Sequence, residues 1–114
     1  MSGKLSTHVL DTAKGRPAAG LKIELWRIKD NERELLKEAI TNQDGRTERP
    51  LLLGDELKPG AYELVFRVGP YFSKATEDTF LQDVPVRFRI LNPEENYHIP
   101  LLVSPWSYTT YRGS

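Results

Sequence analysis

His8 and His98 are the only histidines in the chain. Histidine is the usual proton acceptor near neutral pH, so these two residues are the first candidates for a hydrolytic site. His8 shares one face of an alternating segment with Ser6 and Leu10, and His98 precedes the apolar run 99–103. A lone histidine on a strand is more often structural than catalytic, so position alone leaves both interpretations open.

Two other kinds of chemistry have weaker support. Ser6 and His8 lie two positions apart and point to the same side of a strand, but a nucleophilic triad also needs an orienting third group and an oxyanion hole. The two histidines lack the HxH or HExxH spacing of a metal site. The absence of cysteine excludes thiolate nucleophiles, thiolate zinc sites and disulfides. We therefore expect neither a metal nor a cofactor.

An arginine and the C-terminal segment are further candidates. Arg46 follows the tight turn signal of Asp44 and Gly45. A turn arginine is most often a solvated cation, but its planar fork also suits an anionic or carbonyl-rich ligand. Residues 108–114 contain two tyrosines and an arginine instead of a charged, flexible tail. They indicate either an ordered end that makes contacts or an edge strand that happens to stop there.

The elements that position these residues are mostly strands, because apolar and polar residues alternate between turn signals. The alternation changes parity at Trp26, which indicates a bulge or twist. Gly69 and Pro70 are expected to end a strand, and Ser73 is expected to cap a short helix over residues 73–80. The fold class is therefore all-β, an antiparallel sandwich of about eight strands with one short helix. The expected strands cover residues 5–11, 21–28, 35–41, 51–53, 62–68, 84–90, 97–103 and 108–112.

Length and composition limit the classes of protein to which the chain can belong. A chain of 114 residues is expected to form one domain over 1–114. Sixteen basic and sixteen acidic residues give a formal charge of zero, which argues against a nucleic-acid partner and makes self-association plausible. No apolar run follows Met1, so we expect no secretory signal, no membrane span and a cytoplasmic location.

Three blocks of the sequence resemble the transthyretin-like family. The first is Leu-Ser-Thr-His-Val-Leu-Asp-Thr at residues 5–12, followed by Gly15, Pro17, Ala18 and Gly20. The second runs from Thr41 through Asp-Gly-Arg at 44–46, and the third covers residues 97–114. The terminal Tyr-Arg-Gly-Ser resembles the branch of this family that hydrolyses 5-hydroxyisourate, whereas Trp106 is a small departure from its pattern. The similarity extends from Leu5 to Ser114.

The resemblance implies a fold, an activity and a site. The family's fold is a transthyretin-like (prealbumin-like) sandwich of eight strands with one short helix, and its members are homotetramers with active sites at a subunit interface. The implied reaction converts 5-hydroxyisourate to 2-oxo-4-hydroxy-4-carboxy-5-ureidoimidazoline in urate breakdown, without a cofactor. The resemblance carries catalytic roles to His8, Arg46 and His98. It carries substrate contacts to His8, Arg46, Tyr111, Arg112 and Ser114, although Arg112 and Ser114 would alternatively only fix the tail.

Two other classes of function remain open at this point. One is a transthyretin-type carrier of hydrophobic, hormone-like ligands, and the other is a structural sandwich module. A carrier needs an apolar channel, and a channel lined by histidines and an arginine argues against it.

Overall fold

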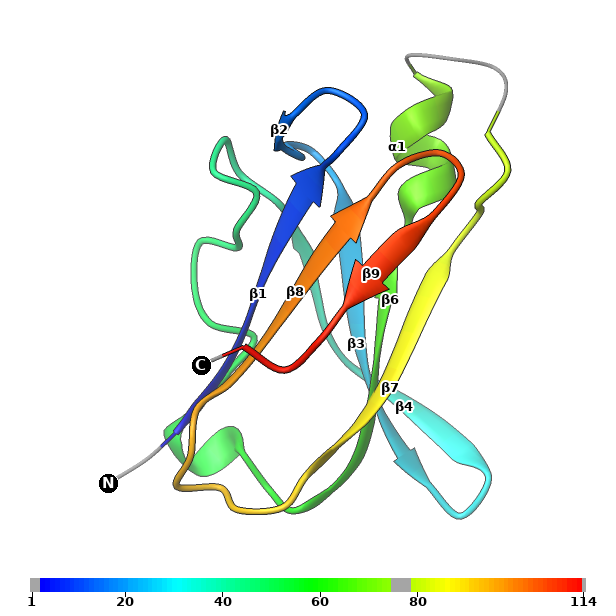
Figure 1. Ribbon diagram of the computed structural model, residues 1–114. Helices are drawn as coiled ribbons and strands as arrows, with labels where there is room; N and C mark the ends of the chain where they lie inside the picture. Colours follow the sequence, from blue (N-terminus) through cyan, green and yellow to red (C-terminus); the bar gives the residue numbers. More distant parts are fainter. Residues whose placement is uncertain (1–2, 75–78, 114) are drawn as a thin grey trace.

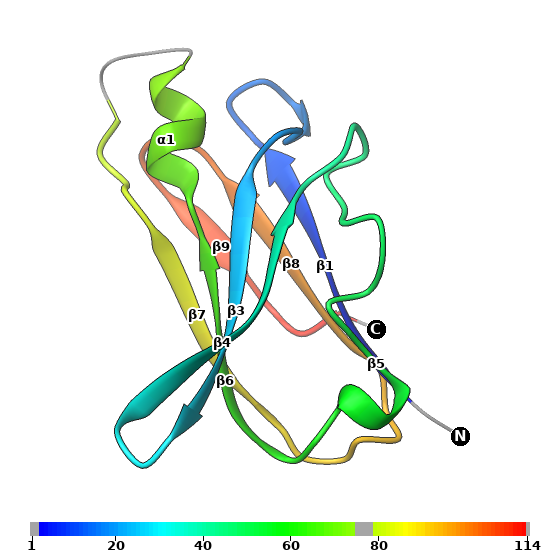
Figure 2. The same cartoon turned by 180° about the vertical axis from the view of Figure 1, so that it is seen from behind.

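Two β-sheets pack face to face in the computed structural model, which describes residues 3–74 and 79–113 (Figures 1 and 2). The strands are β1 (Lys4–Asp11), β2 (Arg16–Pro17), β3 (Lys22–Lys29), β4 (Glu32–Ile40), β5 (Leu52–Leu53), β6 (Gly60–Phe66), β7 (Val84–Ile90), β8 (Tyr97–Val103) and β9 (Tyr108–Thr110). The helices are the short 3-10 helix η1 (Gly54–Glu56) and α1 (Val68–Ser73). One sheet has the order β2-β1-β8-β9 with β5 paired to β1, and the other has the order β4-β3-β6-β7.

The core lies between the sheets because one face of each strand is apolar. Along β1, buried Leu5, Thr7 and Val9 alternate with half-buried residues. Apolar side chains of the second sheet, among them Leu25 and Leu64, are fully buried in the same cluster. This burial confirms the predicted sandwich. The single domain expected over residues 1–114 stays a prediction, which the shared core supports.

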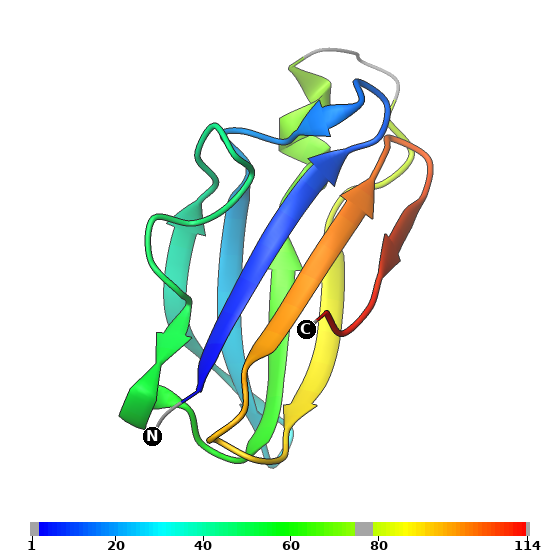
Figure 3. The ribbon, with the colours of Figure 1, turned by 60° about the vertical axis from the view of Figure 1, so that its left-hand side comes forward.

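One strand pair departs from the antiparallel pattern. β1 and β8 run parallel, with Leu5 opposite Tyr97 and Asp11 opposite Val103 (Figure 3). A parallel pair requires a long crossover connection, and here the second sheet supplies it. The pairing brings the first and the penultimate segments of the chain side by side.

The helix begins earlier than the sequence indicates. Strand β6 ends at Phe66, and Gly69 and Pro70 lie inside α1 instead of ending a strand. Proline is tolerated in the first turn of a helix because its missing N–H has no partner there. Ser73, predicted as the helix cap, is the last residue of α1, and residues 75–78 of the predicted helix lie outside the described residues.

The bulge expected at Trp26 is confirmed. The register between β3 and β4 shifts between Leu25 and Trp26, where the alternation changes parity. The turn after β3 has positive φ at Asp30 and Asn31, as a two-residue hairpin turn requires. Strand β2 is not predicted, because two residues are too few to show a period. Within the described residues, no helix has the length and apolar character needed to span a membrane.

Candidate active site

Both histidines lie on the outer face of the first sheet. His8 belongs to the half-buried set that alternates with the core residues of β1, and His98 has the same exposure on β8. The parallel register places Ser6 opposite His98 and His8 opposite Pro100. The two histidines are therefore diagonal neighbours, at roughly 7 to 8 Å between backbone positions, which long side chains can bridge.

A hydrogen bond fixes one edge of the His98 ring. The hydroxyl oxygen Oγ of Ser6 lies 2.9 Å from Nδ1 of His98. The pairing of Ser6 with His8 considered from the sequence is not formed, because the hydroxyl is bonded across the strands. Ser6 thus belongs to the site through His98, a contact across 92 positions that local patterns cannot predict.

Arg46 reaches the same region from a turn that is fastened to β1. The side-chain oxygen Oδ1 of Asn42 accepts hydrogen bonds from the backbone N–H groups of Asp44 and Arg46, at 2.9 and 3.2 Å. Gly45 has a φ of 75°, and its carbonyl accepts from the Val9 N–H at 2.8 Å. A Cβ at position 45 would lie 2.4 Å from the Val9 carbonyl oxygen, so only glycine allows this approach. The turn therefore holds Arg46 beside β1, next to the strand position of His8.

The electrostatic surroundings of His98 include the other site residues. The pKa of His98 is lowered from its ordinary value of 6.5, first by burial and then by the positive charges of Arg46, His8 and Lys4. Burial and neighbouring cations both disfavour the imidazolium form. His98 is therefore held neutral. Lys4 is an exposed cation of the site that the sequence did not reveal.

The C-terminal segment returns to His98 after a break in the ladder. The register of β8 and β9 pairs Leu101 with Thr110, and its continuation would pair Pro100 with Tyr111 and His98 with Gly113. Proline has no N–H to donate, which explains why β9 ends at Thr110. The ladder resumes as an isolated bridge, in which the Gly113 N–H donates to the His98 carbonyl at 2.6 Å.

Gly113 also sets the space around the imidazole ring. A Cβ added at Gly113 would lie 2.9 Å from Cδ2 of His98, closer than carbon atoms pack. The ordered end expected from the sequence therefore contacts a histidine through backbone and ring. A glycine in this tail allows a close backbone approach, but the sequence does not reveal that His98 is the residue approached.

Arg112 holds the tail in place. Its Nη2 donates to Oε1 of Glu95 and to the backbone carbonyl of Asn96, both at 3.0 Å. Its guanidinium carbon lies 4.4 Å from the centre of the Tyr97 ring, a cation–π arrangement. These contacts agree with a tail-fixing role. Contact of Arg112 with substrate stays a prediction.

Tyr111 points to a different part of the chain. It is 57% exposed and lines a hollow of about 300 Å³ with Val86, Phe88 and Ile99, at the open edge between the sheets. No hydrogen bond among the described residues joins its hydroxyl to either histidine. Its predicted contact with substrate stays a prediction. Ser114, the last predicted contact, lies outside the described residues.

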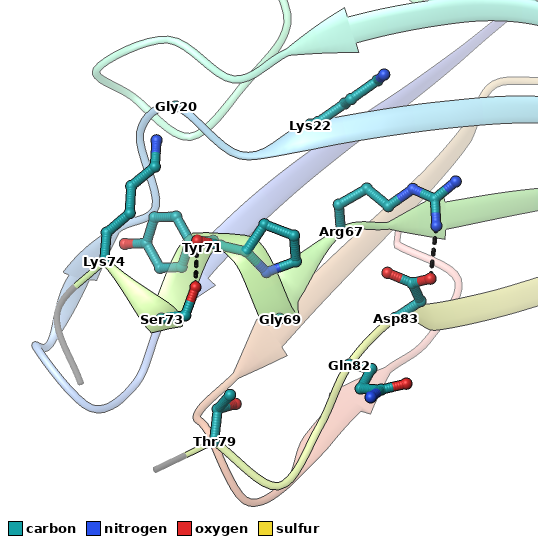
Figure 4. Close-up of a pocket in the computed structure, with 11 residues that line it drawn as sticks. Gly20, Lys22, Arg67, Gly69, Tyr71, Ser73, Lys74, Thr79, Gln82 and Asp83 are labelled. Carbon is teal, nitrogen blue, oxygen red and sulfur yellow. Dashed lines mark hydrogen bonds and ion pairs between the residues drawn. The ribbon is translucent and has the colours of Figure 1, made fainter. Parts of the chain in front are cut away.

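A large hollow lies away from these residues. It has a volume of about 770 Å³ and is lined by α1 and the start of β3 (Figure 4). Arg67 lies on its wall and pairs with Asp83 and Glu24. His8, Arg46 and His98 do not line it, and they occupy the outer sheet surface instead. Among residues 3–74 and 79–113, no three His, Asp or Glu side chains group closely enough to hold a metal ion.

The chain is similar to a known protein family over almost its whole length. A model described as the HIUase/Transthyretin family matches residues 5–113. The chain belongs to this family. A 5-hydroxyisourate hydrolase of Halalkalibacterium halodurans is 53% identical to it, with 100% of both chains covered. This family membership confirms the resemblance seen in the three sequence blocks.

Solved structures of family relatives share the fold. A crystal structure of (S)-allantoin synthase aligns with a TM-score of 0.93 and 48% identity, covering 99% of this chain and 44% of that one. The present chain thus spans less than half of that longer protein. Sea bream transthyretin in complex with thyroxine aligns with a TM-score of 0.89 and 26% identity, covering 96% and 94%. The transthyretin-like sandwich is therefore confirmed.

Proposed function

We propose that this chain hydrolyses 5-hydroxyisourate at the outer face of the first sheet, with His8, Arg46 and His98 as its catalytic residues. The observation that carries the proposal is that the only two histidines, 90 positions apart, are diagonal neighbours there. A cation on a fastened turn accompanies them. The full-length similarity to a 5-hydroxyisourate hydrolase supports the same reaction.

The residues fit the attack of water on a ring carbonyl. One neutral histidine accepts a proton from water as its oxygen bonds to the carbonyl carbon. Arg46 stabilises the negative charge that develops on the carbonyl oxygen. The other histidine donates a hydrogen bond to the reacting centre. The acyl C–N bond then breaks, and the leaving nitrogen receives a proton. None of these steps draws on a metal or a cofactor.

The site is completed by a second copy of the chain in a homotetramer. His8, Arg46 and His98 lie on a sheet surface instead of in a pocket of their own, and Leu10 and Leu102 on that face are half-buried. A flat ring placed there would keep one side in water, whereas enclosure strengthens the electrostatic contacts that stabilise a transition state. A facing copy supplies the enclosure and covers the two leucines.

Light scattering tests the assembly. Four chains of 13.0 kDa give 4 × 13.0, or about 52 kDa, in solution. Leu102→Glu places a charge on the outer face without entering the core, so it should lower the mass and the activity together. A wild-type mass near that of one chain would contradict the shared site. The cytoplasmic location expected from the sequence stays a prediction.

A direct assay tests the activity. Purified protein is mixed with freshly oxidised urate, and the absorbance of the unstable 5-hydroxyisourate is followed in time. Decay should accelerate in proportion to protein concentration and should not respond to a chelator. A decay rate equal to the buffer control would overturn the proposal. Retention of a hydrophobic, hormone-like ligand without this acceleration would instead favour a carrier, for which this polar face offers little support.

A further inference from the structure

We propose that Ser6 is a positioning residue that fixes the tautomer of His98, so that His98 carries its proton on Nε2 and donates it as a hydrogen bond to the substrate. His8 is then the base. This inference rests on the proposed function for its chemical meaning, but the tautomer itself is a property of the free protein. It divides the two histidines between roles that the sequence leaves open.

The first argument is the orientation of the ring. Nδ1 faces Ser6 on β1, and Cδ2 faces Gly113 on the opposite side of β8. The His98 backbone carbonyl is bonded to the Gly113 N–H as well. With both flanks occupied, Cε1 and Nε2 form the free tip of the ring, directed away from the sheet. Nε2 is therefore the nitrogen that faces a ligand on the outer face.

The second argument is an account of the protons. A neutral imidazole has one N–H donor and one acceptor nitrogen, and a hydroxyl is both donor and acceptor. In the described part of the chain, Nδ1 of His98 is the hydrogen-bond partner of the Ser6 hydroxyl. If Nδ1 carried the proton, the hydroxyl hydrogen of half-buried Ser6 would have no acceptor among those residues. The satisfied arrangement is Ser6 O–H donating to Nδ1, with the ring proton on Nε2.

The third argument is that His98 stays neutral, as this arrangement requires. Burial and the nearby cations Arg46 and Lys4 lower its pKa. An imidazolium at this place would carry protons on both nitrogens, so Ser6 could no longer donate to Nδ1. The positive surroundings and the serine thus favour the same single state of the ring.

The tautomer decides the chemistry. Nε2 already carries a proton and the Nδ1 lone pair is occupied, so His98 has no free site to accept a proton from water. His8 takes that proton while the water oxygen bonds to the carbonyl carbon. The electron pair of the carbonyl moves to its oxygen, which Arg46 and the His98 Nε2–H stabilise. The pair returns as the C–N bond breaks, and His8 gives its proton to the leaving nitrogen. His98 keeps its proton throughout.

Nitrogen-15 NMR tests the tautomer directly. With only two histidines, protein labelled at the imidazole nitrogens gives two sets of ring signals, and His8→Gln assigns them. At pH 8 we expect an unprotonated Nδ1 and a protonated Nε2 on His98. Ser6→Ala should shift both signals as the ring samples both tautomers, and Ser6→Thr, which keeps a hydroxyl, should restore them. A protonated Nδ1 in the wild type, or unchanged signals in Ser6→Ala, would overturn the inference.

Kinetics give an independent readout. Ser6→Ala should lower kcat by about tenfold with little change in KM, because the ring loses alignment after the substrate has bound. Ser73→Ala is the control, since it removes an exposed hydroxyl at the end of α1, away from the outer face of the first sheet, and should leave kcat unchanged. A wild-type protein without hydrolase activity but with the Nε2–H tautomer refutes the proposed function alone. An active protein with Nδ1–H refutes this inference alone.

Discussion

Gly113→Ala should inactivate the site while leaving the fold intact. The new Cβ would lie 2.9 Å from Cδ2 of His98. Carbon atoms in contact prefer about 3.5 to 4.0 Å, so ring and tail must separate by about 0.6 to 1.1 Å. Arg112 holds the tail to Glu95 and Asn96, so the ring yields first. A misplacement near 1 Å typically lowers a rate about 100-fold, or about 2.7 kcal/mol of transition-state stabilisation.

Stability should change little in this variant. Gly113 is the last described residue, beyond the end of β9, and no core side chain depends on it. Gly15→Ala is a control variant for which we expect the opposite result. A Cβ there meets no atom within 4 Å, but the φ of 70° is unfavourable for alanine. We expect Gly15→Ala to lose about 1 to 2 kcal/mol of stability and to keep its activity.

Two measurements separate these outcomes. The absorbance assay gives kcat/KM for each variant, and thermal unfolding followed by circular dichroism gives the stability. Gly113→Ala should unfold at the wild-type temperature with a rate reduced about 100-fold, whereas Gly15→Ala should show the reverse. If Gly113→Ala turns over within twofold of wild type and its His98 ring signals do not move, the packing of Gly113 against His98 has no role in catalysis.

Four further predictions concern the same site. His8→Gln and His98→Gln should each lower kcat at least about 100-fold, and near-normal turnover in both would require another base. Arg46→Gln should raise the pKa of His98, measured by NMR titration, because a positive neighbour is removed; an unchanged pKa would show that Arg46 does not act on the ring. The pKa of His98 is lower in the folded protein than in the unfolded protein, where it lies near 6.5. Between these two pKa values the unfolded state therefore binds more protons than the folded state. Stability should therefore decline from pH 6.5 toward the lowered pKa, and less so in His98→Gln. Deletion of residues 111–114 should leave a cooperatively folding chain that no longer hydrolyses 5-hydroxyisourate; wild-type turnover would show that the tail is dispensable.

Much of the fold could be predicted from local patterns, and the site only in part. Alternating residues on β1 and β7 indicate half-buried strands, and Asp44 with Gly45 indicates the turn that precedes Arg46. The start of α1 was misplaced because Gly69 and Pro70 usually interrupt a strand, whereas proline also suits a first helical turn.

The pairing of distant strands could not be predicted from the sequence, for a different reason. A strand's alternation states which residues share a face but not which strand lies beside it or in which direction. The contact of Ser6 with His98 depends on the parallel pairing of β1 with β8, and the contact of Gly113 with His98 depends on the β9 register. The sequence marks Ser6 and the terminal Tyr-Arg-Gly-Ser as notable, but it does not reveal that either contacts His98.

The positive charges around His98 affect both the protonation of the free protein and the charge that develops in the reaction. Arg46 and Lys4 disfavour a second proton on the ring, which keeps the Ser6 contact to Nδ1 available. When negative charge develops on the substrate oxygen, the same cations favour it. A neutral donor between fixed cations stabilises that oxygen without losing its own proton. This explains why a base, which would become cationic itself, is better placed at His8 on the neighbouring strand than at His98.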